Sequence, residues 1–269
     1  MIDLLRFDHK RVIVTGAASG IGRATAEIVA GLGAEVHAFD LNRPEVDPEI
    51  GPVHFVETDM RDPDAIERAV KVVGGPVDAL FNCAGIAGTN SALDILLCNF
   101  CGMRHLTEQI EPLMPKGSAI ATVSSVAGLS WRKKVDDVRA LVGTSSFDEA
   151  RLWCAENGTR VGLPYGFSKR AVTFYVLTKA PQLVDRGLRI NTVSPGATAT
   201  GMWKEFEGRM DQAVLDDAMG VSGRPALPEE QARALVFLSS PAASYINGAD
   251  LVVDGGREAA VVASAVIGA

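Results

Sequence analysis

Short apolar runs with strand character recur along the chain, and segments with helical spacing of apolar residues lie between them. Parallel strands need long crossover connections, so this alternation predicts an α/β fold with helices on both faces of one sheet. The predicted strands are residues 12–14, 35–39, 53–57, 79–82, 119–123, 189–193 and 251–253. The predicted helices are residues 20–32, 64–73, 92–112, 165–185 and 228–238. We therefore expect a doubly wound, Rossmann-type sheet of seven parallel strands.

The length and composition fit one folded domain. A chain of 269 residues with 47% hydrophobic and 22% charged residues lies within the range of a single globular domain. No segment rich in Gly, Pro or Ser divides it, and it contains no internal repeat. We expect residues 1–269 to form one domain.

Charge and hydrophobicity exclude several classes of partner. The net charge of −7 repels phosphate backbones and anionic lipids, so we expect no nucleic-acid partner. No apolar run reaches the roughly 18 residues that cross a bilayer, and the first residues lack a signal peptide, so we expect a cytoplasmic protein without a membrane partner. The histidines are too scattered for a metal site, and we expect no metal. Four cysteines are too irregularly spaced for disulfides, and we expect reduced thiols at Cys83, Cys98, Cys101 and Cys154.

One long segment interrupts the alternation after the fifth strand. It spans about 40 residues, whereas a strand-to-helix turn usually takes 2 to 6. Residues 132–142 have helical spacing, and Ser146 with Glu149 forms a capping box for a second helix that ends near Gly158. These features predict a helical insert at about 130–163. Its apolar side chains need a surface to cover, and we expect that surface to be the active site. The alternative is a surface feature without a function. The apolar residues are Trp131, Leu141, Phe147, Leu152 and Trp153.

A glycine-rich turn follows the first strand and leads into the first helix, with the sequence Thr15-Gly-Ala-Ala-Ser-Gly-Ile-Gly22. Glycines allow a tight turn and let backbone N–H groups approach a pyrophosphate at the helix N-terminus. Three residues rather than one separate Gly16 from Gly20, so the turn alone is a weak signal. Asp40 ends the second strand, where a carboxylate can bind ribose hydroxyls. Together they predict a dinucleotide site, against the alternative of a generic turn and an unrelated surface Asp.

Asp40 also favours NAD over NADP. A carboxylate about 4 Å from a 2′-phosphate would oppose it by about 4 kcal/mol at an effective dielectric of 20. No arginine occupies residues 17–19, and Leu41 follows Asp40, so the loop lacks cations for the extra phosphate. Only Arg43 could soften this preference.

Tyr165 and Lys169 lie four residues apart on a predicted helix and therefore share one face. A phenol has a pKa near 10, and a nearby cation lowers it, so the pair suits proton transfer with a hydroxyl group. Such pairs also arise by chance in many helices. Ser125 follows a sheet strand at the edge where doubly wound folds bind ligands, and its hydroxyl can hold a carbonyl oxygen.

These residues resemble the short-chain dehydrogenase/reductase family over nearly the whole chain. Besides the glycine-rich turn, the matching segments are Asp59, Asn82-Cys-Ala-Gly85, Asn99, Val123-Ser-Ser125, Tyr165-Gly-Phe-Ser-Lys169, Asn191-Thr-Val-Ser-Pro-Gly196 and Val253-Asp-Gly-Gly256. The resemblance implies that Tyr165 exchanges the proton, Lys169 lowers its pKa and holds the nicotinamide ribose, and Ser125 orients the substrate oxygen. It also implies that Asn99 takes part in a water relay. The alternative is that Asn99 is a buried amide whose hydrogen bonds are all made within the core. The implied NAD-binding residues are Gly16, Ser19, Gly20, Ile21, Gly22, Asp40, Leu41, Asp59, Met60, Asn82, Cys83, Ala84, Gly85, Tyr165, Lys169, Pro195, Gly196, Thr198 and Thr200.

Two departures from the family pattern narrow the comparison. Cys83 replaces a usual second asparagine, and Ser125 lies unusually far from Tyr165 in sequence. An insert at this position is similar to the bacterial 3α-hydroxysteroid dehydrogenase/carbonyl reductase subgroup, which also has stretches like residues 195–198 and 240–245. That resemblance implies an apolar alcohol or ketone as substrate. Enoyl reductases of this family have a wider spacing between their Tyr and Lys than the four residues found here, which argues against an enoyl reductase.

The expected function is therefore NAD-dependent interconversion of a secondary alcohol and a ketone, with an apolar substrate such as a hydroxysteroid, terpenoid or aromatic alcohol. One alternative is a cis-dihydrodiol or other diol dehydrogenase, and another is a non-catalytic dinucleotide-binding regulator. The resemblance implies a homodimer or homotetramer, with subunits paired through the helices after Asn90 and Tyr165 and through the last strand. The apolar tail, residues 257–269, is expected to contact another subunit or cover the cleft, against the alternative of a frayed terminus.

Overall fold

One sheet of seven parallel strands organises the computed structural model, which describes residues 4–47, 49–209 and 211–267. The strand order is β3-β2-β1-β4-β5-β6-β7, which confirms the predicted doubly wound sheet. The strands are β1 (Arg11–Thr15), β2 (Glu35–Asp40), β3 (Val53–Glu57), β4 (Ala79–Asn82), β5 (Ala119–Val123), β6 (Arg189–Pro195) and β7 (Asp250–Val253). Each differs from its predicted range by two residues or fewer at either end.

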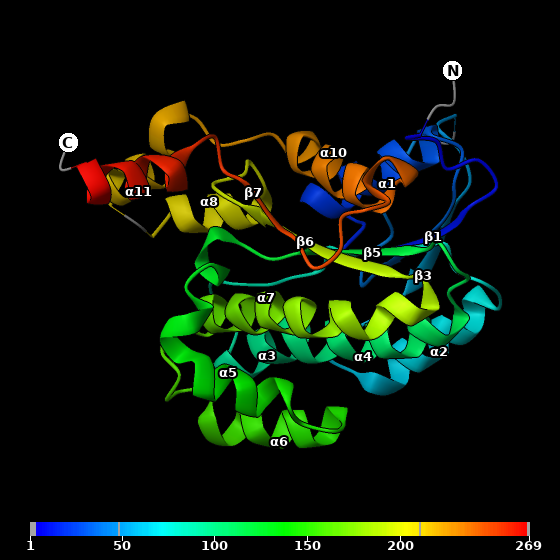
Figure 1. Ribbon diagram of the computed structural model, residues 1–269, viewed down its shortest axis with the longest axis horizontal. Helices are drawn as coiled ribbons and strands as arrows, with labels where there is room; N and C mark the ends of the chain where they lie inside the picture. Colours follow the sequence, from blue (N-terminus) through cyan, green and yellow to red (C-terminus); the bar gives the residue numbers. More distant parts are fainter. Residues whose placement is uncertain (1–3, 48, 210, 268–269) are drawn as a thin grey trace.

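Helices cover both faces of the sheet (Figure 1). α1 (Gly20–Gly31) and α10 (Pro228–Ser239) pack together on one face, while α2 (Pro63–Val73), α4 (Met103–Ile110) and α7 (Pro164–Leu183) lie on the other. The central strands are buried on both sides, so they read as continuous apolar runs rather than alternating ones. Two hydrophobic cores result, one on each face.

The helix expected over residues 92–112 is one helical run of several types. It begins as α3 (Ala92–Leu96), continues as the π-helical turn Leu97–Gly102, and becomes α4 before a 3₁₀ turn at Glu111–Leu113. π-Helical turns occur frequently at functional sites, and this one contains Asn99.

The insert is helical, as predicted. A 3₁₀ turn, Trp131–Lys134, leads into α5 (Val135–Val142), and α6 (Phe147–Asn157) follows. The Ser146 hydroxyl accepts a hydrogen bond from the Glu149 N–H at 3.1 Å and caps α6. Both helices lie outside the α4 and α7 layer, away from the sheet (Figure 1).

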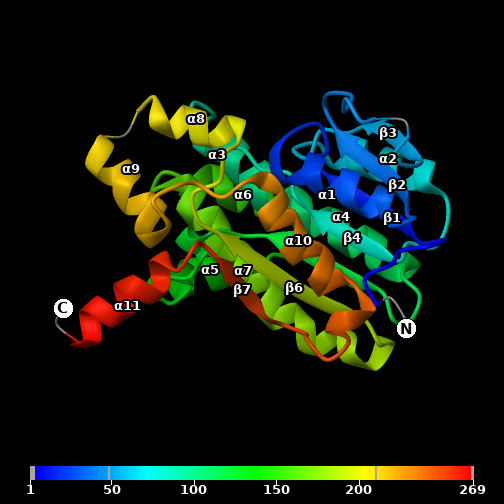
Figure 2. The same ribbon diagram turned by 90° about the horizontal axis from the view of Figure 1, so that it is seen from above.

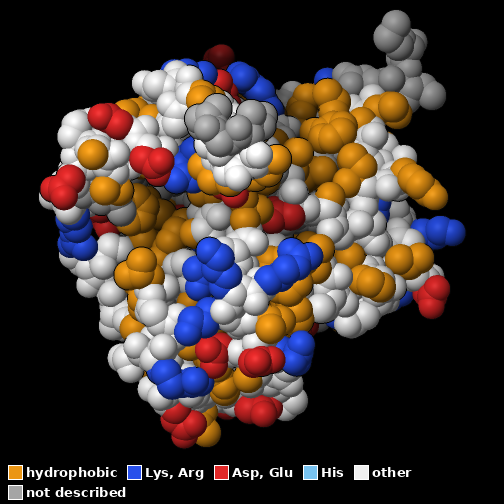
Figure 3. All heavy atoms as spheres, turned by 60° about the vertical axis from the view of Figure 1, so that its left-hand side comes forward, with side chains coloured by type: hydrophobic (Ala, Val, Ile, Leu, Met, Phe, Trp, Pro, Cys, Tyr) orange, Lys and Arg blue, Asp and Glu red, His pale blue; other side chains and the backbone are white. Residues whose placement is uncertain are grey.

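Three helices were not predicted from the sequence: α8 (Gly201–Glu207), α9 (Gln212–Met219) and α11 (Arg257–Ile267) (Figure 2). α11 contains most of the apolar tail, and residues 268–269 lie outside the described part. Val266 on α11 is 79% exposed. An open groove of about 800 Å³ runs between β7 and α11 and is lined mainly by Val and Ala side chains. Apolar side chains are also prominent on that side of the molecule (Figure 3). The function of the tail stays a prediction.

Within the described ranges, no helix is long and apolar enough to cross a membrane. The same residues contain no group of three or more His, Cys, Asp or Glu side chains placed to hold a metal ion. All four cysteines are free thiols.

Candidate active site

The predicted site residues gather at the carboxyl ends of the strands. The glycine-rich turn follows β1, Asp40 ends β2, Asp59 follows β3, and Ser125 follows β5. The strand order reverses between β1 and β4, and ligands of doubly wound folds bind beside such a switch point. The sheet therefore brings together residues that lie far apart in sequence.

The glycine-rich turn forms a close-packed cradle against the loop after β4. Gly16 has a φ of +67°, and a Cβ there would lie 2.8 Å from the Ala84 Cα. A Cβ on Gly22 would lie 2.1 Å from the Gly16 carbonyl oxygen. The Thr15 hydroxyl fixes the two loops together, because it accepts hydrogen bonds from the N–H groups of Cys83 and Ala84, both at 3.0 Å. Only glycine allows this turn, and the cradle fits the pyrophosphate of a dinucleotide.

Asp40 is connected directly to this turn. Its Oδ2 accepts a hydrogen bond from the Ala18 N–H at 3.0 Å, so the carboxylate orders the loop in addition to any ribose contact. Leu41 beside it is exposed, and Arg43 stacks on the Phe55 ring with its guanidinium 5.0 Å from the ring centroid. The Arg43 cation is thus engaged with β3 in this structure.

The segment after β6 closes the other side of the cradle. Thr200 caps α8 by accepting a hydrogen bond from the Trp203 N–H at 3.3 Å, and its methyl group would lie 3.1 Å from a Cβ on Gly20. A Cβ on Gly196 would lie 2.8 Å from the Asp254 Cβ, so β6 and β7 approach closely where they end. The end of β6 and the start of α8 thus approach the cradle.

The Asn82 side chain turns away from this cradle. It is buried and donates hydrogen bonds to the hydroxyl oxygens of Thr107 at 3.0 Å and Thr122 at 3.3 Å. The side chain therefore supports the sheet, which leaves the backbone of Asn82 for the predicted cofactor contact.

Tyr165 and Lys169 project from the first turns of α7, with the Lys169 Nζ 5.8 Å from the Tyr165 ring centroid. The ammonium is buried and donates a hydrogen bond to the Val123 carbonyl at 2.8 Å. Burial lowers the pKa of Lys169 to about 8. Burial raises the pKa of Tyr165, and a hydrogen bond from Ser125 acts in the opposite direction. Three predicted catalytic residues are thus within reach of one another in a desolvated centre.

The two adjacent serines have different environments. The Ser124 hydroxyl is buried, lies 2.7 Å from the Thr173 hydroxyl and donates to the Lys169 carbonyl at 3.2 Å. Ser125 faces Tyr165, and its hydroxyl accepts a hydrogen bond from the Ala127 N–H at 3.2 Å. Only Ser125 is therefore placed to contact a substrate oxygen.

Asn99 lies behind this centre, with its side chain fully engaged. Its Oδ1 accepts from the Ile86 N–H at 2.8 Å, and its Nδ2 donates to the Ile86 carbonyl at 3.0 Å and the Ser168 hydroxyl at 3.1 Å. A Cβ on Gly85 would lie 3.4 Å from the Asn99 Oδ1 and 3.6 Å from the Lys169 Nζ. Asn99 thus joins the loop after β4 to α7, and a part in a water relay stays a proposal.

Phe206 is a site residue that the sequence analysis missed. It lies on α8, and its ring meets the Tyr165 ring edge to face with centroids 6.1 Å apart. Glu205 on the same helix approaches Gly88 in the loop after β4. The capping residue Thr200, followed by Trp203 and Phe206 at helical spacing, is the signal that would have located this helix.

The insert packs behind the site and does not cover it. Trp153 stacks on Phe167 of α7 at 5.8 Å between centroids, and Phe147 meets His105 of α4 at 5.6 Å. Trp131 lies against Phe174 of α7 and Leu141 is buried in the core, whereas Leu152 is exposed to solvent. The expectation that the insert caps the active site is therefore wrong, because four of its five apolar residues pack against α4, α7 or the core and the fifth faces solvent.

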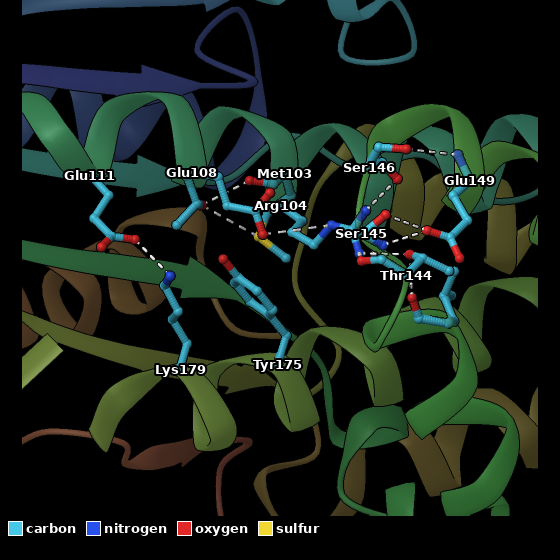
Figure 4. A network of polar contacts seen from close by, with 12 residues as sticks. Met103, Arg104, Glu108, Glu111, Thr144, Ser145, Ser146, Glu149, Tyr175 and Lys179 are labelled. Atoms are coloured by element: carbon cyan, nitrogen blue, oxygen red, sulfur yellow. Dashed lines mark hydrogen bonds and ion pairs between the residues drawn. The ribbon is translucent and has the colours of Figure 1, made fainter. Parts of the chain in front are cut away.

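A buried arginine fastens the insert to α4 (Figure 4). The Arg104 guanidinium donates to the Thr144 carbonyl at 3.0 Å, to the Thr144 hydroxyl at 2.8 Å and to the Ser146 carbonyl at 2.8 Å. These acceptors lie in the turn between α5 and α6. One side chain therefore gives hydrogen bonds to oxygen atoms of the turn that apolar packing alone would leave without donors.

Comparisons with known proteins agree with this geometry. A family described as short chain dehydrogenase matches residues 10–135, and one described as Enoyl-(Acyl carrier protein) reductase matches residues 139–258. The chain is 29% identical to a coniferyl-alcohol dehydrogenase of Pseudomonas sp. (strain HR199 / DSM 7063), covering 94% of this chain and 98% of that protein. It is also 29% identical to a 3-alpha-hydroxysteroid dehydrogenase/carbonyl reductase of Comamonas testosteroni, covering 92% and 96%.

Among solved structures, the chain is similar to the 3-alpha-hydroxysteroid dehydrogenase from Pseudomonas sp. B-0831 complexed with NADH. The TM-score is 0.79 at 30% sequence identity, and the match covers 94% of this chain and 99% of that one. The sequence similarity and the fold similarity to these proteins both extend over more than nine-tenths of this chain. The chain therefore belongs to the short-chain dehydrogenase/reductase family and is an oxidoreductase.

Proposed function

We propose that this oxidoreductase uses NAD to interconvert a secondary alcohol and a ketone, and that its substrate is apolar. The observation that carries the proposal is the desolvated centre in which Tyr165, Lys169 and Ser125 meet beside the glycine-rich cradle. A binding module without turnover would have no use for a half-buried phenol beside a buried ammonium, which argues against a non-catalytic regulator.

Ser125 holds the substrate oxygen by hydrogen bonding, and the Tyr165 phenol exchanges the proton with that oxygen. In the oxidation direction the hydroxyl proton moves to the Tyr165 Oη, and in reduction it returns to the carbonyl oxygen. The Lys169 ammonium stabilises the phenolate form of Tyr165. Bound NAD would supply the acceptor for the hydride of the alcohol carbon, and bound NADH the donor for the reverse reaction.

The chain's own residues supply the NAD site. The cradle around Gly16, Gly20 and Gly22 takes the pyrophosphate, and Asp40 takes the adenosine ribose hydroxyls. Asp59 accepts a hydrogen bond from adenine, and Thr200 borders the cradle near the nicotinamide end. Because Asp40 carries a negative charge and Leu41 none, the site favours NAD over NADP.

The apolar substrate is inferred from the surroundings of Tyr165. Phe206 presents an aromatic edge to the Tyr165 ring. Such an apolar group at a reaction centre gains most from a substrate that removes it from water. Hydroxysteroids, terpenoid alcohols and aromatic alcohols share this property.

A substrate panel tests the proposal. Hydroxysteroids, terpenoid alcohols, aromatic alcohols and diols are each assayed with NAD and with NADP by the formation of reduced nucleotide. We expect NAD-dependent oxidation of one of the apolar secondary alcohols. Highest catalytic efficiency on small polyols would favour a diol dehydrogenase, and binding of NADH without turnover of any alcohol or ketone would favour a regulator.

A further inference from the structure

Arg61 grips the Asp59 carboxylate with a two-pronged contact in the loop between β3 and α2. The Arg61 Nη2 lies 2.7 Å from Oδ2, and Nε lies 2.9 Å from Oδ1 and 3.2 Å from Oδ2. The Arg61 backbone N–H donates to Oδ1 at 2.8 Å. This contact holds the pKa of Asp59 below its usual value, so at neutral pH the carboxylate is ionised and can accept hydrogen bonds but not donate them.

These contacts leave the carboxylate with one open acceptor position. Each carboxylate oxygen can accept about two hydrogen bonds. Oδ1 receives the Arg61 N–H and the shorter arm of the Nε–H. Oδ2 receives Nη2 and only the longer arm, at 3.2 Å, of that same Nε–H, so three donor hydrogens are available for about four acceptor positions. The remaining position is therefore on Oδ2. Asp59 is half-buried, so a ligand can still reach this oxygen.

The surrounding structure fixes both residues of the pair. The Arg61 Nη1 also lies 3.4 Å from the Asp94 Oδ1 at the start of α3. Gly102 of the π-helical turn lacks a Cβ that would otherwise lie 1.8 Å from the Met60 carbonyl oxygen, so the loop sits directly against that turn. The guanidinium is thus held by two carboxylates on a loop that cannot shift freely.

We propose that Arg61 is a positioning residue for the cofactor, which orients Asp59 so that its one open oxygen position accepts an N–H of the adenine 6-amino group. This inference rests on the proposed NAD site. A purine with a carbonyl at C6 would place an acceptor against the carboxylate and would be rejected. Without the Arg61 guanidinium, water occupies the freed acceptor positions of Asp59 and its side chain rotates. The preference for adenine over a purine with a carbonyl at C6 then decreases.

The test compares NADH with its hypoxanthine analogue, deamino-NADH, in which a carbonyl replaces the 6-amino group and N1 carries a hydrogen. Dissociation constants are measured by nucleotide fluorescence, without substrate or turnover. A hydrogen bond to a charged group contributes about 1.5 to 3 kcal/mol, so the wild-type protein should prefer NADH by about tenfold or more.

Arg61→Met should reduce this preference at least fivefold, through weaker NADH binding. Arg61→Lys should behave like Arg61→Met, because one ammonium cannot reproduce the two-pronged contact. Arg68→Met is the matched control: Arg68 lies 3.6 Å from Asp62 on the neighbouring turn and does not touch Asp59, so the preference should be unchanged. Thermal unfolding near the wild-type temperature confirms that each variant is folded, as expected for a partly exposed ion pair.

Asp59→Asn separates this inference from the proposed site. If it abolishes the preference while Arg61→Met retains it within twofold, Arg61 has no positioning role. If Arg61→Lys keeps the full preference, charge alone suffices and the two-pronged geometry is irrelevant, which also overturns the proposal. If Asp59→Asn itself keeps the preference, the adenine contact at Asp59 is wrong, and a wild-type protein that binds neither nucleotide contradicts the proposed function.

Discussion

The Phe206 ring on α8 meets the Tyr165 ring on α7 edge to face, with centroids 6.1 Å apart. These residues come from opposite sides of the sheet, since α7 covers one face and α8 follows β6 toward the other (Figures 1 and 2). The contact places an apolar side chain beside the phenol that we propose as the proton carrier. A substrate that reaches the Tyr165 hydroxyl is therefore expected to meet the Phe206 ring as well.

Phe206→Ala should raise the KM for bulky apolar alcohols by about threefold to tenfold, because an aromatic contact contributes about 0.5 to 1.5 kcal/mol. The KM for a small alcohol and the dissociation constant for NADH should barely change. Val214→Ala, which removes an exposed apolar side chain from α9, serves as the control. Equal effects on large and small alcohols would show that Phe206 supports α8 and does not contact substrate.

Asp40→Asn should weaken the preference for NAD over NADP by tenfold or more, because it removes the negative charge and keeps one acceptor for the Ala18 N–H. Adding Leu41→Arg should shift the preference further toward NADP. Catalytic efficiencies with the two cofactors measure the effect. A wild-type protein equally efficient with both would show that Asp40 does not approach the 2′ position.

Tyr165→Phe removes one hydroxyl and should lower kcat by about 100-fold or more, the scale of lost general acid-base catalysis. The dissociation constant for NADH should stay within twofold of wild type. The comparison requires steady-state kinetics and nucleotide fluorescence on the same preparation. Retention of most of the activity would exclude Tyr165 as the proton carrier.

Lys169→Met should abolish activity and stabilise the cofactor-free protein. The folded-state pKa of about 8 lies below the ordinary 10.5, so at neutral pH burial of the charged ammonium costs stability. Replacing it should raise the free energy of unfolding by about 1 to 3 kcal/mol at pH 7. Between pH 8 and 10.5 the unfolded chain binds more protons than the folded one, so the wild-type protein gains stability and the difference shrinks. Urea unfolding across this range checks the sign, and a variant less stable than wild type at pH 7 would contradict it.

The insert should limit assembly to a homodimer. It covers the outer faces of α4 and α7, the helices through which the family resemblance implies that subunits pair, and leaves β7 at the open edge of the sheet. Light scattering at micromolar concentration should therefore give twice the chain mass. A tetramer would show that a second interface forms despite the insert.

The seven-stranded sheet, most of the helices and the residues at the strand ends could be predicted from the amino-acid sequence alone. Strands such as Arg11–Thr15 are buried on both faces, so their apolar runs are local and continuous, and the capping box at Ser146 is equally local. The glycine-rich turn and the Tyr165–Lys169 pair were recognisable because backbone geometry and helix spacing fix their residue types and intervals.

Which helix surfaces pack against each other became known only from the folded chain. The apolar residues of the insert needed a partner, but periodicity cannot say whether that partner is the active site or the outer faces of α4 and α7. The same holds for Phe206 beside Tyr165, for Arg104 at the turn of the insert, and for the Asn82 side chain, which faces Thr107 and Thr122. These contacts join residues that are distant in sequence. A side chain can be buried or hydrogen-bonded by any neighbour that the fold brings near it, so such contacts leave no local pattern in the sequence.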